Sequence, residues 1–334
     1  MKILFSALGA AQAGFDCAER KGIGHPDTLA DLIADTFSRE YSRWCLKEFG
    51  VIPNHWVDKV TLVGAASHVA FGSFTIARPV QCHLIGKITE QVGDRPIPLM
   101  ELFEQATLHV MAEALGGTSI WPHLLLFIAS TSGTAVDHDA RFYAPGGPED
   151  LRKVLRSETV ANDTVICTGS SGPGPAGRLA IWLEEHIRHI APAQIGTDVK
   201  TLVVRQGDRY DVTAAVPVHP ETVQSWREYA DLIDAFRDRL KSDLAARCDA
   251  ELHLNTKDRA ERGYLAPFGT ALGKGDCGVV GRGNRAYGVI EPLRPAGCEA
   301  PAGKTRSTTA GRSTALWLAA PHRRWRPRAA ARPR

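Results

Sequence analysis

A turn-forming segment immediately before a strongly periodic helix constrains the fold of this chain more than any other feature. It runs from Glu19 to Asp27 and reads Glu-Arg-Lys-Gly-Ile-Gly-His-Pro-Asp. Its glycines lack a Cβ, so they let the backbone approach another group closely. Pro26 fixes its own φ and disfavours a helical conformation at His25. The sequence therefore predicts a stiff turn, with His25 extended, that aims His25 and Asp27 in set directions.

The charges of this segment point to a ligand. It combines Lys and Arg with Glu, Asp and an imidazole. Cations, a carboxylate and open backbone are the groups that bind a polyphosphate through a divalent metal ion. The alternative is an ordinary helix start, with Asp27 as the N-cap after a proline turn. A cap requires one oxygen only, so a polyphosphate-binding turn accounts for more of the segment.

The composition is that of a globular protein with a sizeable core. The 334 residues are 44% hydrophobic and 23% charged, and no run reaches the ~18 apolar residues typical of a membrane-spanning helix. Residues 1–14 resemble a weak signal peptide. Their apolar stretch is short and interrupted by glycine, so we expect a first strand there instead.

The cysteines indicate a reducing compartment. Seven are scattered through the chain without a C-x-x-C pair. An odd number in a long chain argues against a disulfide framework and favours reduced thiols in a cytoplasm. No set of cysteines and histidines has the spacing of a zinc site.

Hydrophobic periodicity predicts an α+β fold. The clearest helix covers residues 27–49, where apolar side chains recur at spacings of three and four. Further helices are expected at 99–115, 178–190 and 221–248. Strands are expected at 57–63, 80–89, 120–129 (buried) and 251–256, with a hairpin of 199–205 and 210–218. Hairpins interleaved with helices that cover one sheet face indicate α+β rather than a doubly wound sheet.

Polar residues gather in four further places. These are Asn162-Asp163-Thr164, Asp198-Val199-Lys200, the glycine-rich run from Gly273 to Arg285, and Ala302-Gly303-Lys304. None has the order of a P-loop or of a dinucleotide-binding turn. Each glycine-rich segment is weak evidence alone. Residues 169–177 are explained by a solvated loop, and a simple turn remains an alternative for 281–285.

In their order along the chain, these segments resemble the S-adenosylmethionine synthetases, specifically the archaeal type. The resemblance runs from about Phe15 to Lys304. Its most specific parts are the first and the GRGNR segments. The matching segments are ERKGIGHPD (19–27), HWVDKVTLVG (55–64), ANDT (161–164), GTDVK (196–200), HLNT (253–256), GDCGVVGRGNR (275–285) and EAPAGK (299–304).

The resemblance implies a methionine adenosyltransferase. In such an enzyme the sulfur of methionine attacks C5′ of ATP, and the tripolyphosphate released is hydrolysed to phosphate and pyrophosphate. It also implies three similar strand-and-helix subdomains about a pseudo-threefold axis, with the catalytic region at 1–304. Mg²⁺ and K⁺ are the implied cofactors. A cytoplasmic homodimer with its site between two subunits is implied, with ATP and methionine as ligands and neither membrane nor nucleic acid as a partner.

The resemblance also implies roles for individual residues. The catalytic residues would be His25, toward the ribose or the leaving oxygen, Asp163, toward methionine and the sulfonium, Lys200 and Arg282. Asp27 would hold Mg²⁺ on the phosphates, and Asp58 would be the ligand of a monovalent cation. Nucleotide, methionine and polyphosphate would be bound by Glu19, Lys21, Asp198, Asp276, Arg285 and Lys304.

Several positions depart from the archaeal pattern. Cys277 replaces the second Asp of the family's G-D-D-G turn, and Ser73-Phe74 follow Gly72 where glycines are expected. Residues 169–173 replace an aromatic-rich stretch of the substrate loop, which leaves the thioether substrate open. A specialised or catalytically impaired paralogue that binds ATP or S-adenosylmethionine is therefore the alternative function.

The end of the chain departs most. Nine of the 40 lysines and arginines, and none of the 37 acids, lie from Lys304 onward. We attribute residues 305–334 to a frameshift near Lys304 in a GC-rich gene, which would leave the last subdomain incomplete and the tail without a family-like fold. Resequencing the gene there tests this hypothesis. A nucleic-acid-binding arm is the competing interpretation.

Overall fold

The computed structural model of the chain describes residues 14–131, 140–157, 172–285, 287–294, 296 and 300–304. Four expectations lie wholly or partly outside these residues. They are the first strand within 1–14, the role of Asp163, the substrate loop at 169–173, and the character of the tail at 305–334.

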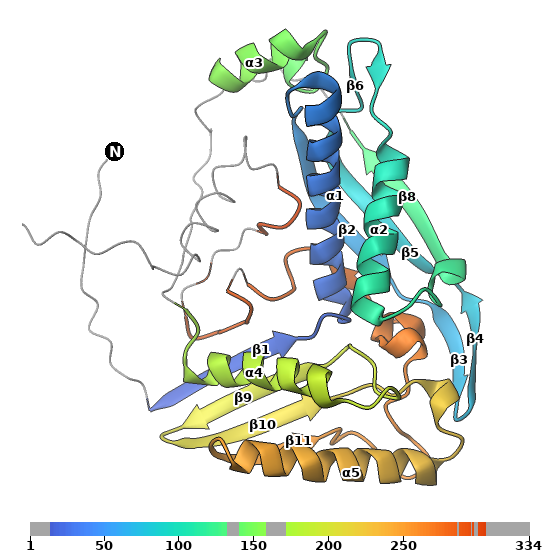
Figure 1. Cartoon of the computed structure of the whole chain (residues 1–334), viewed down its shortest axis with the longest axis vertical. Helices are drawn as coiled ribbons and strands as arrows, with labels where there is room; N and C mark the ends of the chain where they lie inside the picture. Colours follow the sequence, from blue (N-terminus) through green and yellow to red (C-terminus); the bar gives the residue numbers. More distant parts are fainter. Residues whose placement is uncertain are drawn as a thin grey trace, which may run out of the picture.

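The first unit of the fold is a four-stranded sheet covered on one face by two helices (Figure 1). Its strand order is β12-β2-β5-β8, and β5 pairs antiparallel with β2 but parallel with β8. Helices α1 and α2 pack side by side over it (Figure 1). The bounds are α1 Pro26–Phe49, β2 His55–Val63, β5 Val80–Ile88, α2 Leu99–Leu115, β8 Leu124–Ser130 and β12 Gly278–Val279.

Helix α1 confirms the periodicity predicted for it. Leu29, Ile33, Phe37 and Tyr41 recur every four residues and are fully buried against the sheet. The helix stops at Gly50, whose φ of 66° is the left-handed conformation that glycine adopts most readily.

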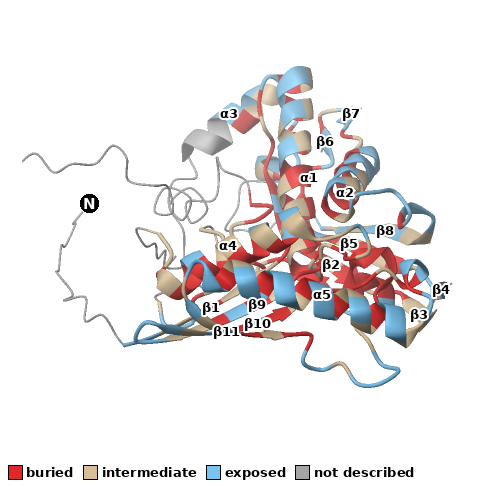
Figure 2. Cartoon of the chain, turned by 60° about the horizontal axis from the view of Figure 1, so that its bottom comes forward, coloured by how far each residue is buried: buried red, intermediate tan, exposed pale blue. Residues whose placement is uncertain are grey.

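The second unit is a sheet of order β1-β9-β10-β11, covered on one face by α4 and α5 (Figures 1 and 2). The predicted hairpin is confirmed, because β9 and β10 pair antiparallel from Lys200↔Ala215 to Gln206↔Arg209. β11 adds to β10 in parallel, and β1 pairs antiparallel with β9. The bounds are β1 Phe15–Lys21, α4 Pro175–Ile190, β9 Lys200–Gln206, β10 Arg209–Ala215, α5 Trp226–Ala245 and β11 Asp249–Leu254.

The remaining elements are short. Sequence patterns did not predict the hairpin β3–β4 or the helix α3. The bounds are β3 Ala66–Ala70, β4 Ser73–Arg78, β6 Gln91–Val92, β7 Arg95–Pro96 and α3 Pro148–Ser157, with 3₁₀ turns at Trp121–His123, Ala140–Phe142, Pro220–Thr222, Pro267–Gly269 and Ala271–Lys274.

Two predicted elements require correction. The apolar segment 120–129 was expected to form a buried strand, but β8 begins only at Leu124 and lies at the edge of its sheet. Leu125 and Phe127 on its outer face are 46% and 41% exposed. The helix expected at 221–248 begins at Trp226, because Ser225 accepts a hydrogen bond from the Glu228 N–H as N-cap.

The structure confirms a mixed α+β fold with several sheets. Among the residues described, two sheets carry helices on one face, and no third four-stranded sheet is formed. Buried side chains gather between each sheet and its helices (Figure 2). Within the same residues, no helix combines the length and hydrophobicity required to cross a membrane.

Candidate active site

The predicted stiff turn at residues 22–25 rests on the loop that precedes β9. The Gly22 N–H donates to the carbonyl of Val199 at 2.7 Å, and the Gly24 N–H donates to that of Thr197 at 3.1 Å. On the other side, the Thr270 hydroxyl donates to the Gly24 carbonyl at 2.7 Å. The glycines are therefore required for close backbone contact, which joins the motif at 19–27 to that at 196–200.

Replacing Gly22 by alanine (G22A) is expected to destabilise the fold by about 1–3 kcal/mol, because the site is already close-packed. A Cβ there would meet the carbonyl oxygens of Thr197 and Val199, each at 2.8 Å. Urea unfolding measures the loss. G117A is the matched control, since a Cβ at Gly117 meets nothing within 4 Å. Equal stability changes in the two variants would show that this backbone contact is not tight.

His25 is extended, as predicted, with φ −68° and ψ 136°. It is His25, and not Asp27, that caps α1, because its Nδ1 accepts the Asp27 N–H at 3.1 Å. The cap alternative for Asp27 is therefore wrong. With Nδ1 accepting, the proton of the neutral imidazole resides on Nε2, which is left as a donor.

Burial lowers the pKa of His25 to about 4. The charge of Asp198 opposes this shift, and those of Lys200 and Lys21 add to it. The ring is therefore neutral at physiological pH, and it donates a hydrogen bond without carrying a charge.

This burial predicts a pH-dependent loss of stability. The unfolded chain has a His pKa of about 6.5 and binds the proton more readily than the folded chain, whose pKa is about 4. The unfolding free energy is therefore expected to fall as pH drops from about 6.5 toward 4, by about 3 kcal/mol in total. Urea unfolding at pH 7 and pH 5 measures this against H25N, which retains a capping acceptor but does not titrate. A parallel decline in both proteins would contradict the assignment.

Side chains of β1 alternate between the site and the core. Arg20 points to α4, where its Nη2 pairs with Glu184 Oε2 at 3.0 Å, so this arginine fixes β1 instead of serving a ligand. Lys21 faces the site, and its Nζ lies 2.9 Å from Asp27 Oδ2 and 3.9 Å from Glu19 Oε1. The alternation of a strand separates two cations that are adjacent in sequence.

Lys21 also links the first motif to the GRGNR segment. Its Nζ donates to the carbonyl of Arg282 at 2.7 Å, and its backbone exchanges two hydrogen bonds with the side chain of Asn284. The Arg282 side chain is exposed, so it is available to a ligand. The Arg285 guanidinium donates to the Gly281 carbonyl at 3.0 Å, within the same turn.

A buried carboxylate organises the other half of the site. Asp198 is fully buried, and its oxygens accept from the Ala271 N–H and from Lys200 Nζ, each at 2.8 Å. Lys200 Nζ also donates to the Tyr264 hydroxyl at 2.9 Å, and that hydroxyl lies 3.4 Å from Asp198 Oδ2. Burial and the charge of Asp198 raise the pKa of Tyr264 above its usual range, so the hydroxyl stays protonated and can donate to Asp198.

Sequence reasoning missed Tyr264 and assigned no role to Lys274, although Lys274 lies in the glycine-rich run singled out from Gly273 to Arg285. Both come from the loop between β11 and β12, and the Lys274 ammonium lies 4.7 Å from the centre of the Tyr264 ring. Asp276 follows, exposed at the surface, and its charge acts on Lys274 and on Tyr264. The signal in the sequence was Gly263-Tyr264, an aromatic residue in a loop that ends in the glycine-rich run.

A ladder of carboxylates on α1 holds the glycine-rich turns. Asp27, Asp31 and Asp35 recur every four residues, and they accept the N–H groups of Val279, Gly281 and Gly303 at 3.0, 2.8 and 2.9 Å, respectively. Burial raises the pKa of Asp31 to about 6. The hydrogen bond from Gly281 opposes this rise, and the charge of Asp35 adds to it. One face of α1 therefore fixes the positions of the turn at Val279–Gly281 and of the segment around Gly303.

Asp58 and Lys304 form a pair apart from the other predicted residues. Lys304 Nζ lies 3.1 Å from Asp58 Oδ1 and 4.8 Å from the centre of the Trp56 ring. Burial alone would raise the pKa of Asp58, but hydrogen bonds from Lys59 and Lys304 hold it below its ordinary value. The pair lies beside Gly303, whose N–H donates to Asp35. Asp35 lies two turns of α1 beyond Asp27, a distance of about 12 Å along the helix.

The structure therefore brings most of the predicted residues together. Those gathered around the turn at 22–25 are Glu19, Lys21, His25, Asp27, Asp198, Lys200, Asp276 and the Arg282–Arg285 turn. Asp58 and Lys304 lie elsewhere in the same chain, and Asp163 is outside the described residues.

Comparison with known proteins decides the family. The model of the S-adenosylmethionine synthetase (AdoMet synthetase) family matches residues 6–312. The chain belongs to this family. It is 30% identical over 312 residues to the S-adenosylmethionine synthase of Pyrococcus furiosus, covering 89% of this chain and 74% of that protein. It is 33% identical over 310 residues to that of Haloarcula marismortui, covering 90% and 74%.

A solved structure supports the fold of an S-adenosylmethionine synthetase. It is an unusual S-adenosylmethionine synthetase from Campylobacter jejuni, with a TM-score of 0.51 at 14% identity over 91% of this chain and 72% of that one. The archaeal relatives confirm the predicted resemblance. The family match ends at residue 312, a few residues beyond Lys304.

Proposed function

We propose that this chain is a methionine adenosyltransferase, which forms S-adenosylmethionine from ATP and methionine. The observation that carries this is the convergence of Lys21, His25, Asp27 and Lys200 on one turn, beside the GRGNR segment. Cations, a neutral donor and a carboxylate that are fixed on backbone contacts suit a bound triphosphate. Membership of the family supplies the reaction class.

The reaction requires a positioned leaving group and no covalent intermediate. The methionine sulfur attacks C5′, the C5′–O bond breaks, and both electrons of that bond leave on the tripolyphosphate while sulfur becomes a sulfonium. Lys21, Lys200 and the exposed Arg282 would stabilise the charge that grows on the leaving oxygen and the phosphates. His25 would donate its Nε2–H to the ribose or to the leaving oxygen.

Asp27 suits a magnesium ion carried by the substrate. Mg²⁺ is usually held by one or two carboxylates together with substrate phosphates. The Asp27 carboxylate lies beside Lys21, a second phosphate-binding group, at 2.9 Å. Held by Asp27, the ion would supply positive charge that offsets the charge of the phosphates. The K⁺ role of Asp58 stays a prediction, and a K⁺ there would compete with two ammonium groups, since Lys59 and Lys304 both bind this carboxylate.

The proposed homodimer has a candidate surface on the first sheet. The face opposite α1 and α2 carries large apolar side chains that are 38–46% exposed. These are Trp56, Ile85, Leu125 and Phe127. A cluster of this kind on a soluble chain marks an interaction surface. We place the subunit contact on this face, which would allow Asp58 and Lys304 to serve a site shared with the partner.

Replacing Phe127 by glutamate (F127E) is expected to convert the dimer to a monomer and to abolish S-adenosylmethionine formation. A charged side chain on this apolar face opposes burial of the face in a subunit contact. Sedimentation velocity gives the mass, and M100E on α2 is the control, since Met100 is similarly exposed, at 47%, and lies outside the sheet face. A dimer that survives F127E would place the contact elsewhere.

The decisive experiment is turnover. The chain is incubated with ATP, methionine, Mg²⁺ and K⁺, and S-adenosylmethionine, phosphate and pyrophosphate are quantified. Equal amounts of the three products support the proposal. Binding of ATP or S-adenosylmethionine without turnover would favour the specialised paralogue, for which Cys277 in the polyphosphate-binding turn is the specific observation.

A further inference from the structure

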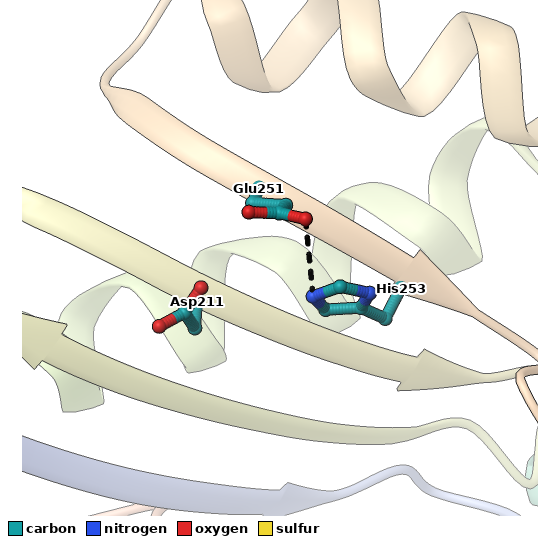
Figure 3. A group of neighbouring side chains, drawn as sticks. All are labelled: Asp211, Glu251 and His253. Atoms are coloured by element: carbon teal, nitrogen blue, oxygen red, sulfur yellow. Dashed lines mark ion pairs between the residues drawn. The ribbon is translucent and has the colours of Figure 1, made fainter.

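We propose a second metal site, for a borderline divalent transition ion such as Zn²⁺, formed by Asp211, Glu251 and His253 on the outer face of the second sheet. Figure 3 shows the three side chains on the same side of two neighbouring strands. Their ligand atoms, one imidazole nitrogen and two carboxylate oxygens, all lie within 4.8 Å of one another. Among the described residues, no other such group of three occurs.

The strand register brings these side chains together. Asp211 on β10 is the direct partner of Glu251 on β11 in a parallel ladder, and His253 follows Glu251 by two residues, on the same face. Because the sequence separates Asp211 from Glu251 by a whole helix, spacing along the chain does not indicate this set. The search for zinc spacing among cysteines and histidines therefore missed it.

The electrostatics of the group favour a cation. Two carboxylates directly opposite each other across a ladder repel. Arg209 Nη2 binds Glu251 Oε2 at 3.0 Å, while Glu251 Oε1 faces His253 Nε2 at 3.8 Å. One oxygen of Glu251 is thus committed to an arginine, and the other points toward the imidazole and the space shared with Asp211 (Figure 3).

The ligand set selects the class of metal. Imidazole together with carboxylates suits Zn²⁺ and its neighbours, whereas Mg²⁺ and Ca²⁺ prefer oxygen ligands alone. Ligands of a tetrahedral Zn²⁺ lie roughly 3.4 Å apart, given metal–ligand distances near 2.1 Å. Rotation of exposed side chains closes the 4.8 Å spread to that value. Three protein ligands leave a position for water, as in open zinc sites.

The metal group shares no residue with the cavity beside the proposed polyphosphate site. Glu19 and Lys200 line a cavity of about 160 Å³ on the same face of the sheet, and Thr213 lines it from β10. Thr213 is the register partner of His253 and follows Asp211 by two residues on β10, so the metal group borders that cavity. A metal bound here is held by protein ligands without ATP.

A titration of the full chain with Zn²⁺ tests this proposal. The protein is stripped with a chelator, its thiols are alkylated, and calorimetry is run with a large excess of Mg²⁺ and no nucleotide. One equivalent of Zn²⁺ is expected to bind. H253A is expected to lose this equivalent, whereas H109A retains it, because His109 lies 3.4 Å from a single carboxylate, that of Glu113. Far-ultraviolet circular dichroism checks folding, which the 42% exposed His253 side chain should not disturb.

Further outcomes sharpen the assignment. Co²⁺ is expected to give visible d–d bands without a sulfur charge-transfer band, and D211N is expected to weaken binding. Absence of binding by the wild-type chain, or equal binding by the wild type and H253A, would overturn the proposal.

Discussion

Replacing His25 by alanine is expected to lower kcat for S-adenosylmethionine formation by about 10²–10⁴-fold, the usual contribution of a positioned proton donor. The ring is held neutral by burial, and its Nδ1 is occupied by the Asp27 N–H, so Nε2 is the atom that acts. The loss should appear in single-turnover measurements of the chemical step, at saturating ATP and methionine.

The cap and the donor can be separated at this position. H25A removes both and should also cost about 1 kcal/mol of stability, whereas asparagine is a strong N-cap that cannot reproduce the reach of Nε2. H25N is therefore expected to keep the stability of the wild type at pH 7 and to lose the rate. H109A, on the exposed surface of α2, controls for loss of an imidazole. If H25N retained the wild-type kcat, His25 would have no part in the chemical step.

Replacing Asp198 by asparagine (D198N) is expected to damage both stability and catalysis. Its carboxylate accepts from Ala271, Lys200 and Tyr264, and an amide cannot accept from all of them. The ammonium of Lys200 would also lose its counter-charge. Removing one partner of a buried pair costs about 3–5 kcal/mol, and we expect the lower end of that range because Lys200 is one-third exposed.

The rate should fall by about 10²-fold or more, since Lys200 would no longer be held toward the phosphates. Thermal unfolding measures the loss of stability, and initial rates measure the loss of activity. Y264F should show part of the loss of activity without the loss of stability. D208N is the matched control, because the Asp208 side chain is fully exposed in the β9–β10 turn. A D198N protein with the stability of D208N would show that the Asp198 interactions contribute little.

Local patterns predicted those elements whose stability depends on their own sequence. The bounds of α2 and the pairing of β9 with β10 were predictable because periodicity and turn residues are local signals. The turn at 22–25 was predictable because Pro26 restricts the conformation of His25 and the two glycines permit close backbone contact. The archaeal resemblance then supplied the remaining residues of the site.

Features that depend on distant partners were not predictable. The exposure of β8 depends on its position at the edge of its sheet, and its apolar sequence does not indicate whether a strand is central or at an edge. The separation of Arg20 from Lys21 required knowing that β1 has α4 on one face. Tyr264 joins the site through hydrogen bonds to Asp198 and Lys200, more than sixty residues away along the chain.

The carboxylate ladder on α1 has a consequence for synthesis of the protein. Asp27, Asp31 and Asp35 leave the ribosome 250 to 268 residues before their hydrogen-bond donors at Val279, Gly281 and Gly303. Until then three neighbouring carboxylates repel one another on a helix. The first motif of the chain therefore cannot reach its final geometry until these donors have emerged, and slow translation near residue 280 would prolong a state in which α1 is formed but the site is not.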